Sequence, residues 1–225
     1  MCGRFTLTVD PAQLIEQFGL AGPPPAALHP RYNIAPTQPV AVIANSDGPR
    51  HVELFQWGLI PAWAKDPAIG SKLINARAET LAEKPAFRTA LKRRRCLVLA
   101  DGFYEWQKLG SRKQPQYIQL KDGRPFAFAG LWESWRPAPG ADPLHTCTVI
   151  TTEPNALMAE IHNRMPVILS PADYAAWLTP GDLPAAEALA LLHSYPAEAM
   201  QARPVSTAVN SPARDEPALL LPVAA

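Results

Sequence analysis

The chain has 225 residues, of which 48% are hydrophobic and 18% charged, and its formal net charge is +1. This composition excludes a disordered chain, and no apolar run approaches the ~20 residues that span a bilayer. The first residues lack the basic and apolar segments of a secretory signal, so we expect a cytoplasmic protein with no membrane partner. The three cysteines, Cys2, Cys96 and Cys147, lie far apart, which argues against a disulfide scaffold and a zinc site. We therefore expect neither a metal nor a cofactor.

Basic residues are concentrated in one part of the chain. Residues 61–124 carry roughly eight more basic than acidic side chains, whereas residues 125–225 carry roughly six more acidic ones. Such asymmetry favours one basic face and a polyanion as the partner, although a solvated surface of Lys and Arg is an equally ordinary explanation.

The predicted elements are short and mixed in type. Residues 12–18 follow Asp10 and precede Gly19, which is the pattern of a capped helix. Further elements are expected, in chain order, at residues 40–44 and 52–57 (a hairpin), 79–91 (a helix interrupted at Pro85), 96–100 and 103–107 (strands), 117–120 and 126–131 (a hairpin around Asp122-Gly123), 146–152 (a strand), 155–161 (a helix), 165–169 (a strand), and 171–178 and 183–192 (helices). With no clear linker, the pattern predicts one α+β domain over residues 1–225 with a largely antiparallel sheet.

The first five residues, Met1-Cys2-Gly3-Arg4-Phe5, place a thiol at position 2. Removal of Met1 leaves Cys2 with a free amine of pKa about 8 beside a thiol of pKa about 8.5. Such a 1,2-aminothiol attacks an aldehyde twice: the amine forms a Schiff base and the sulfur then closes a five-membered thiazolidine ring. The alternative interpretation is that Cys2 is an ordinary buried apolar residue of a first strand.

Six short stretches in this order resemble the SRAP (SOS response-associated peptidase) family. They are Met1-Cys2-Gly3-Arg4-Phe5, Tyr32-Asn33-Ile34-Ala35-Pro36, Trp57-Gly58-Leu59-Ile60-Pro61, Asn75-Ala76-Arg77-Ala78-Glu79, Asp101-Gly102-Phe103-Tyr104-Glu105-Trp106 and Ile161-His162-Asn163-Arg164-Met165-Pro166. The likeness extends to Val209-Asn210. It implies an α+β fold around a barrel-like, largely antiparallel sheet flanked by short helices. It also implies that Cys2 crosslinks to abasic sites in single-stranded DNA and so protects the lesion. We expect a monomer.

The resemblance implies three further catalytic residues. Asn75 would hydrogen-bond the sugar or orient the Cys2 amine, although an Asn at this place is also an ordinary turn or capping residue. Glu105 would open the sugar ring and move protons, unless it is a surface carboxylate of its strand. His162 would transfer protons during weak strand cleavage and crosslink reversal, unless it is a structural histidine.

The residues that the resemblance assigns to DNA binding are basic or aromatic. They are Arg4, Arg77, Arg95 and Arg164 beside phosphates, and Trp63 and Trp106 for stacking on bases. Some family members carry a second aromatic residue directly after the first, and this chain has Ala64 there. An inward, core role for Trp106 is an open alternative.

Two other functions are compatible with the same residues. A cysteine peptidase would use Cys2 as its nucleophile, His162 as its base and Asn75 to orient the base. A non-catalytic single-strand binding module would need the basic face and the aromatic residues, but neither Cys2 nor Glu105.

Overall fold

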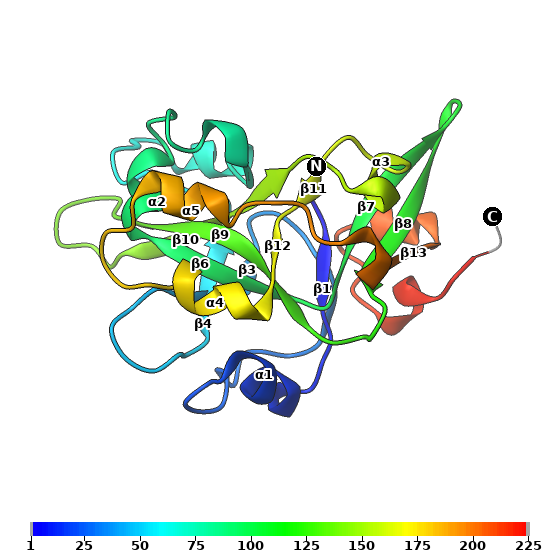
Figure 1. Cartoon of the computed structure of the whole chain (residues 1–225), viewed down its shortest axis with the longest axis horizontal. Coiled ribbons are helices and arrows are strands. Elements are labelled where there is room, and N and C mark those ends of the chain that lie inside the picture. Colours follow the sequence, from blue (N-terminus) through cyan, green and yellow to red (C-terminus); the bar gives the residue numbers. More distant parts are fainter. Residues whose placement is uncertain (1, 224–225) are drawn as a thin grey trace.

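The computed structural model describes residues 2–223 and contains two β-sheets that share a hydrophobic core (Figure 1). Five of the eight strands of the first sheet form a ring: β3 (Pro39–Ala44), β4 (Glu53–Trp57), β6 (Arg95–Ala100), β9 (Phe126–Trp135) and β10 (Leu144–Thr152). They pair in the order β3, β4, β10, β9, β6 and back to β3, so the sheet closes into a barrel. Within this ring only the β4–β10 pair is parallel.

A second, antiparallel sheet packs beside the barrel. Its strands, in spatial order, are β13 (Met200–Pro204), β8 (Arg112–Leu120), β7 (Gly102–Leu109), β1 (Phe5–Leu7) and β2 (Arg31–Ile34). Phe5 of β1 meets Trp57 and Phe128 of the barrel edge-on, with ring centroids 5.0 and 5.7 Å apart. Phe103 of β7 meets Phe128 at 6.0 Å. These aromatic contacts fix β1 and β7 against the barrel.

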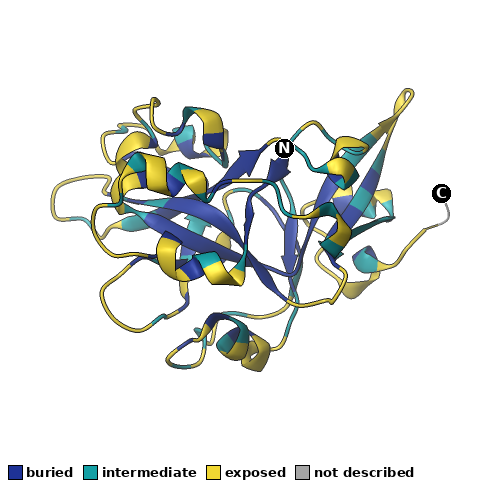
Figure 2. Ribbon diagram, in the orientation of Figure 1, coloured by how far each residue is buried: buried dark blue, intermediate teal, exposed yellow. Residues whose placement is uncertain are grey.

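Within residues 2–223, three short strands, five short α-helices and several 3₁₀ turns complete the fold. The strands are β5 (Asn75–Arg77), which pairs with β10, β11 (Met165–Pro166), which also pairs with β10, and β12 (Ile168–Leu169), which pairs with β9. The helices are α1 (Pro11–Phe18), α2 (Arg88–Arg93), α3 (Ala156–Ala159), α4 (Tyr174–Trp177) and α5 (Ala185–Ala190). The strands are mostly buried, whereas the helices expose their outer faces (Figure 2). Among residues 2–223 no helix has the length and apolar character needed to cross a membrane.

The predicted fold class is confirmed: the molecule is α+β, with a largely antiparallel barrel and short helices. The predicted first helix is also confirmed. The Asp10 side chain accepts a hydrogen bond from the Ala12 amide at 2.7 Å, and Gly19 ends the helix in a left-handed conformation with φ 61°. The sequence therefore determined this helix locally, through its caps.

Two predictions about elements are wrong. Strands β8 and β9 follow one another around Asp122-Gly123 but do not pair, because β8 lies between β7 and β13 whereas β9 belongs to the barrel. The predicted helix at residues 79–91 is reduced to a 3₁₀ turn at Ala78–Thr80 and to α2, which begins three residues after Pro85. Proline lacks the amide hydrogen and crowds the preceding turn, so it separates the two segments.

Candidate functional site

Strand β10 brings together the segments that carry three of the predicted catalytic residues, Cys2, Asn75 and His162. Its residues Val149 and Thr151 pair with Asn75 and Arg77 of β5. Its last residues, Thr151 and Thr152, pair with β11, which begins three residues after His162. The start of the chain joins them through a hydrogen bond from Asn75 Nδ2 to the Cys2 carbonyl, 2.8 Å long. Segments distant in sequence therefore meet at the C-terminal end of β10.

Cys2 is fully buried in the hydrophobic core and lies three residues before β1, outside the strand. Its thiol points to the Arg4 carbonyl, with 3.8 Å between Sγ and the oxygen. Burial raises the pKa of this thiol, and the negative charge of Glu105 raises it further. The surroundings of the sulfur therefore disfavour the thiolate.

Glu105 is 2% exposed, so it is not the surface carboxylate that the sequence left open. It lies on β7 and shares a face with Phe103, since side chains alternate along a strand. Phe103 packs into the same core cluster as Cys2. The carboxyl group and the thiol are therefore both enclosed at the contact between the two sheets.

The two polar atoms of the Asn75 side chain differ in their hydrogen bonding. Its Nδ2 holds the Cys2 carbonyl, whereas its Oδ1 is buried and receives no hydrogen bond from any residue of the described range 2–223. A buried acceptor without a donor costs about 1–3 kcal/mol. A donor on a bound molecule, or the amine of Cys2, would remove that cost.

The ring of His162 has a defined orientation. Its Nδ1 accepts a hydrogen bond from the Arg164 backbone amide at 3.0 Å. An amide N–H can only donate, so Nδ1 is the acceptor and the neutral ring carries its hydrogen on Nε2. His162 therefore presents an N–H donor on its other edge.

Arg164 is held by Glu79, a residue to which sequence reasoning gave no role. Two parallel hydrogen bonds of 2.8 and 2.9 Å join its guanidinium to the carboxylate, and a third reaches the Thr151 carbonyl at 2.7 Å. This hydrogen bonding lowers the pKa of Glu79. A phosphate at Arg164 would have to share or displace Glu79. The pair also fixes the backbone that orients His162.

Arg4 and Trp106 both contact the C-terminal segment. Arg4 donates to Asn33 Oδ1 at 2.9 Å and to the Val209 carbonyl at 2.7 Å. Trp106 donates from Nε1 to Asn210 Oδ1 at 2.8 Å and packs, partly buried, against the cluster around Val209. Asn33 and Asn210 thus organise two predicted DNA-binding residues. Both lie in stretches that carry the family resemblance, although sequence reasoning gave neither of them a role.

Arg95 does not lie on a DNA-facing surface. It is fully buried, and its guanidinium donates to the main-chain carbonyls of Leu91, Lys92, Trp177, Thr179 and Gly181. The predicted phosphate contact is contradicted, because a strand of DNA cannot reach a side chain enclosed in this way. Arg95 instead ties β6 to the ends of α2 and α4.

Trp63 and Arg77 are exposed, as residues that contact a ligand must be. Trp63 is 62% exposed on a turn closed by a 2.8 Å hydrogen bond from Ala64 N to the Pro61 carbonyl. Trp135 fixes this turn by donating from Nε1 to the Ala64 carbonyl at 2.7 Å. The turn therefore presents an indole ring on a restrained backbone.

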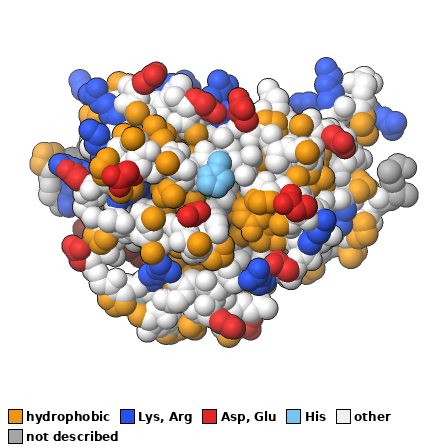
Figure 3. Space-filling model, viewed as in Figure 1, with side chains coloured by type: hydrophobic (Ala, Val, Ile, Leu, Met, Phe, Trp, Pro, Cys, Tyr) orange, Lys and Arg blue, Asp and Glu red, His pale blue; other side chains and the backbone are white. Residues whose placement is uncertain are grey.

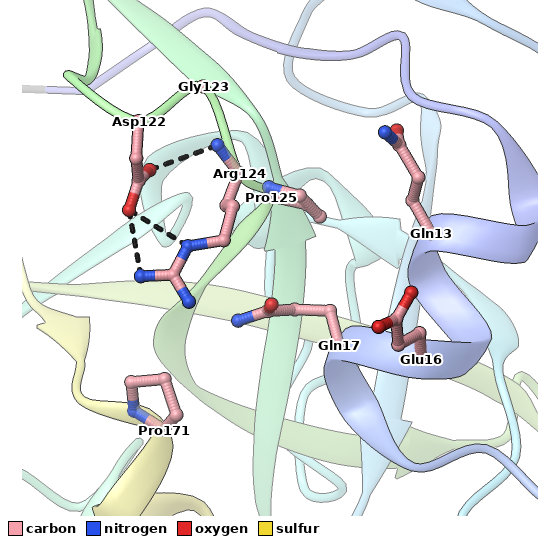
Figure 4. A pocket seen from close by; sticks show the side chains of 8 residues that line it. All are labelled: Gln13, Glu16, Gln17, Asp122, Gly123, Arg124, Pro125 and Pro171. Atoms are coloured by element: carbon pink, nitrogen blue, oxygen red, sulfur yellow. Dashed lines mark hydrogen bonds and ion pairs between the residues drawn. The ribbon is translucent and has the colours of Figure 1, made fainter.

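A hollow of about 470 Å³ lies elsewhere, between α1 and the turn after β8 (Figure 4). Arg124 on its wall is paired with Asp122 at 2.7 Å, and Gln13, Glu16 and Gln17 of α1 face them. None of the predicted site residues lines it. The chemistry of the chain is therefore not concentrated in this hollow.

Comparison with known proteins identifies the family of the chain. A family model described as SOS response associated peptidase (SRAP) matches residues 1–212. The chain belongs to the SRAP family.

This SRAP chain is similar to curated proteins from bacteria and vertebrates. It is 48% identical to the abasic site processing protein YoqW of Bacillus subtilis, over 98% of this chain and 99% of that protein. It is 39% identical to the abasic site processing protein HMCES of Xenopus tropicalis, over 75% of this chain and 56% of that protein. The fold matches the crystal structure of a Bacteroides thetaiotaomicron protein with a TM-score of 0.88 and 29% identity, covering 99% of this chain and 100% of that one.

Proposed function

We propose that this protein processes abasic sites by forming a covalent crosslink between Cys2 and the lesion in single-stranded DNA. The observation that carries the proposal is the setting of Cys2, whose carbonyl is held by Asn75 and whose thiol lies within the field of buried Glu105. The names of the relatives YoqW and HMCES, both abasic site processing proteins, support the substrate.

The proposed reaction needs the amine of Cys2, and therefore removal of Met1, which lies outside the described residues. The amine adds to the C1′ aldehyde of the ring-opened sugar, and loss of one water gives a Schiff base. The sulfur then bonds to C1′, and the imine nitrogen gains the proton that the thiol loses. The product is a thiazolidine, and water is the only molecule released.

Glu105 and His162 would move the protons of this sequence. Burial keeps the thiol protonated, so ring closure needs a nearby group to accept its proton, and Glu105 meets that need. The Nε2–H of His162 would donate to an oxygen of the sugar or of the 3′-phosphate. Proton transfer back to the sulfur would reverse the crosslink, and proton transfer to the leaving 3′-phosphate would give weak strand cleavage.

DNA contacts would come from the exposed groups around this site. Trp63 would stack on a base, and Arg77 would contact a phosphate. Arg4 and Trp106 would act while bound to the C-terminal segment, and Arg164 while paired with Glu79. The phosphates would therefore meet a prearranged set of donors.

The peptidase alternative has weaker support. A cysteine nucleophile attacks as the thiolate, and catalytic sites lower the pKa of that thiol. Here burial and the charge of Glu105 both raise the pKa of Cys2. The enclosure instead suits a thiol that reacts intramolecularly, after the amine has already captured the substrate.

The test is a denaturing gel of purified protein mixed with an oligonucleotide that contains one abasic site. We expect a heat-stable shifted band whose mass equals protein without Met1 plus DNA, less one water. The variant Cys2→Ser keeps the amine but has a poorer ring-closing atom. It should therefore give an adduct only when the Schiff base is trapped with borohydride.

Cys147→Ala is the matched control, because Cys147 is another fully buried cysteine, and it should form the adduct normally. Retention of Met1 in the mature protein, or an undiminished heat-stable band with Cys2→Ala, would refute the proposal. A shift seen only on native gels would favour a binding module, and peptide cleavage without an adduct would favour a peptidase.

A further inference from the structure

The hairpin of β7 and β8 ends in a basic tip that the chemistry above does not use. We define the hairpin tip as residues 108–113, with the sequence Lys-Leu-Gly-Ser-Arg-Lys. All six residues are exposed, and the hairpin projects beyond the body of the molecule (Figures 1 and 2). Lys and Arg side chains gather at the same corner of the surface (Figure 3). Within residues 2–223 no carboxylate forms an ion pair with Lys108, Arg112 or Lys113.

The cations of the hairpin tip do not stabilise the hairpin. Lys108 stands directly opposite Lys113 in the strand register, and like charges in that relation destabilise a pair of strands. The turn itself needs only Gly110, whose φ is 60°. Leu109 is 53% exposed opposite Arg112, where it buries little. Binding of a ligand therefore explains the basic and apolar side chains of the hairpin tip better than stabilisation of the hairpin does.

The hairpin tip continues the strand that carries Glu105. Side chains alternate, so Glu105, Gln107 and Leu109 share one face of β7. Gln107 Nε2 donates to the Glu160 carbonyl at 3.1 Å, two residues before His162, so this face looks toward the candidate site. At about 3.3 Å per residue, Leu109 lies roughly 13 Å from Glu105 along the strand. A single strand that keeps the stacked, B-like rise of roughly 3.4 Å per nucleotide places about four phosphates in that length.

We propose that the hairpin tip binds the sugar–phosphate backbone of DNA about four nucleotides from the reacting nucleotide. Arg112, on the face of Glu105, and Lys108 and Lys113, on the face of Trp106, contact phosphates at the end of the hairpin. Leu109 packs against the sugars between these phosphates. The distance to the lesion rests on the proposed function of Cys2, whereas binding by the tip requires no lesion. The tip thereby supplies affinity that does not depend on sequence and that salt weakens.

The first test measures affinity for an undamaged single strand of about 20 nucleotides by fluorescence anisotropy, as salt rises from about 50 to about 200 mM. The variant K108A/R112A removes one Lys and one Arg from the tip. Removing one cation that neutralises a phosphate lowers the slope of log affinity against log salt by about 0.7, so the slope should fall by about 1.4. The advantage of the wild type over the variant should then be about sevenfold larger at the low salt concentration than at the high one.

The matched control is K121A/R124A, which removes one Lys and one Arg from the turn at the other end of β8, where both are exposed. It should leave the salt slope unchanged. Equal slopes for the wild type and K108A/R112A, or an equal decrease in both variants, would overturn the proposal. The cations would then only keep the protruding strands soluble.

The second test uses abasic oligonucleotides whose strand ends about two or about six nucleotides from the lesion, on either side. At subsaturating protein, K108A/R112A should form the Cys2 adduct severalfold more slowly than wild type when the strand extends about six nucleotides on the side that reaches the tip. When that side is only about two nucleotides long, the two proteins should react at the same rate. A deficit that does not depend on strand length would contradict the distance. If no adduct forms with any protein, the proposed function fails and the anisotropy result still decides the role of the tip.

Discussion

Replacing Arg95 with Met separates a structural role for this side chain from the DNA contact expected from its sequence context. The guanidinium reaches five carbonyls, of which the bonds to Trp177 at 2.9 Å and Leu91 at 3.1 Å are fully buried. Met has a similar volume and no donor, so the variant leaves these acceptors without partners in the same space. Burial also lowers the pKa of Arg95, yet the group stays protonated because its normal value is very high.

The magnitude follows from the number of acceptors left unsatisfied. A buried polar group that loses its partner costs about 1–3 kcal/mol, and the costs at neighbouring groups do not add fully. Two buried and three partly buried carbonyls therefore give a decrease of roughly 4 kcal/mol in the free energy of unfolding. For a chain of this size that corresponds to a fall in Tm of roughly 12 °C.

Urea unfolding followed by tryptophan fluorescence measures this decrease, and the denaturant slope should stay unchanged. Arg93→Met is the control, since the ion pair of Arg93 with Asp182 leaves both side chains more than 60% exposed. We expect a much smaller decrease there, because solvent screens an exposed ion pair. At a temperature where both variants are folded, Arg95→Met should bind DNA with the salt slope of the wild type. Unchanged stability together with a slope reduced by about 0.7 would refute the reasoning.

Three further predictions concern the site and its supports. Asn75→Ala should slow adduct formation at least about tenfold while lowering Tm by only about 2–4 °C, because it removes one hydrogen bond to Cys2; gel kinetics and calorimetry measure the two effects. Asn33→Ala should cost roughly 3 kcal/mol and expose the C-terminal segment to limited proteolysis, because Asn33 Nδ2 holds three carbonyls of that segment; an intact segment would contradict this. Glu79→Gln should lower stability by about 0.5–1 kcal/mol at pH 7, discounted for the exposure of Glu79. Because the folded pKa of Glu79 is depressed, this difference is present above about pH 4.3 and should vanish in acid unfolding curves as the pH falls through the folded pKa.

Short-range patterns in the sequence predicted the elements whose conformation depends on neighbouring residues. The caps Asp10 and Gly19 gave the first helix, and the apolar run at residues 96–100 gave a strand that is buried in the structure. The turn Asp122-Gly123 was recognised as a turn, but turn chemistry does not say whether the flanking strands pair. Here the partners of β8 and β9 were determined by the closure of the barrel, which depends on contacts remote in sequence.

The candidate site shows the same division between local and distant information. Alternation along β7 puts Phe103 and Glu105 on one face, but it could not decide between a buried and a surface carboxylate, since Tyr104 on the other face is buried as well. A basic run before a strand could not reveal that Arg95 turns inward while Arg93 stays in solvent, because the acceptors for Arg95 come mainly from residues 177–181. The pairing of Glu79 with Arg164 spans 85 positions, so no periodicity could indicate it.

A single strand supplies the geometry of the candidate site. Along β10, Thr146 Oγ1 accepts from the Ile60 amide at 2.9 Å and so fixes the start of the loop that presents the exposed indole. Farther along, β10 pairs with Asn75, and the Thr151 carbonyl then accepts from Arg164. The loop that carries Trp63, the amide that holds the Cys2 carbonyl and the segment that follows His162 are thus attached in order to one buried backbone. A shift of that backbone would move all three together, so disturbing β10 should affect capture of the lesion more than binding of undamaged DNA, which depends on exposed cations.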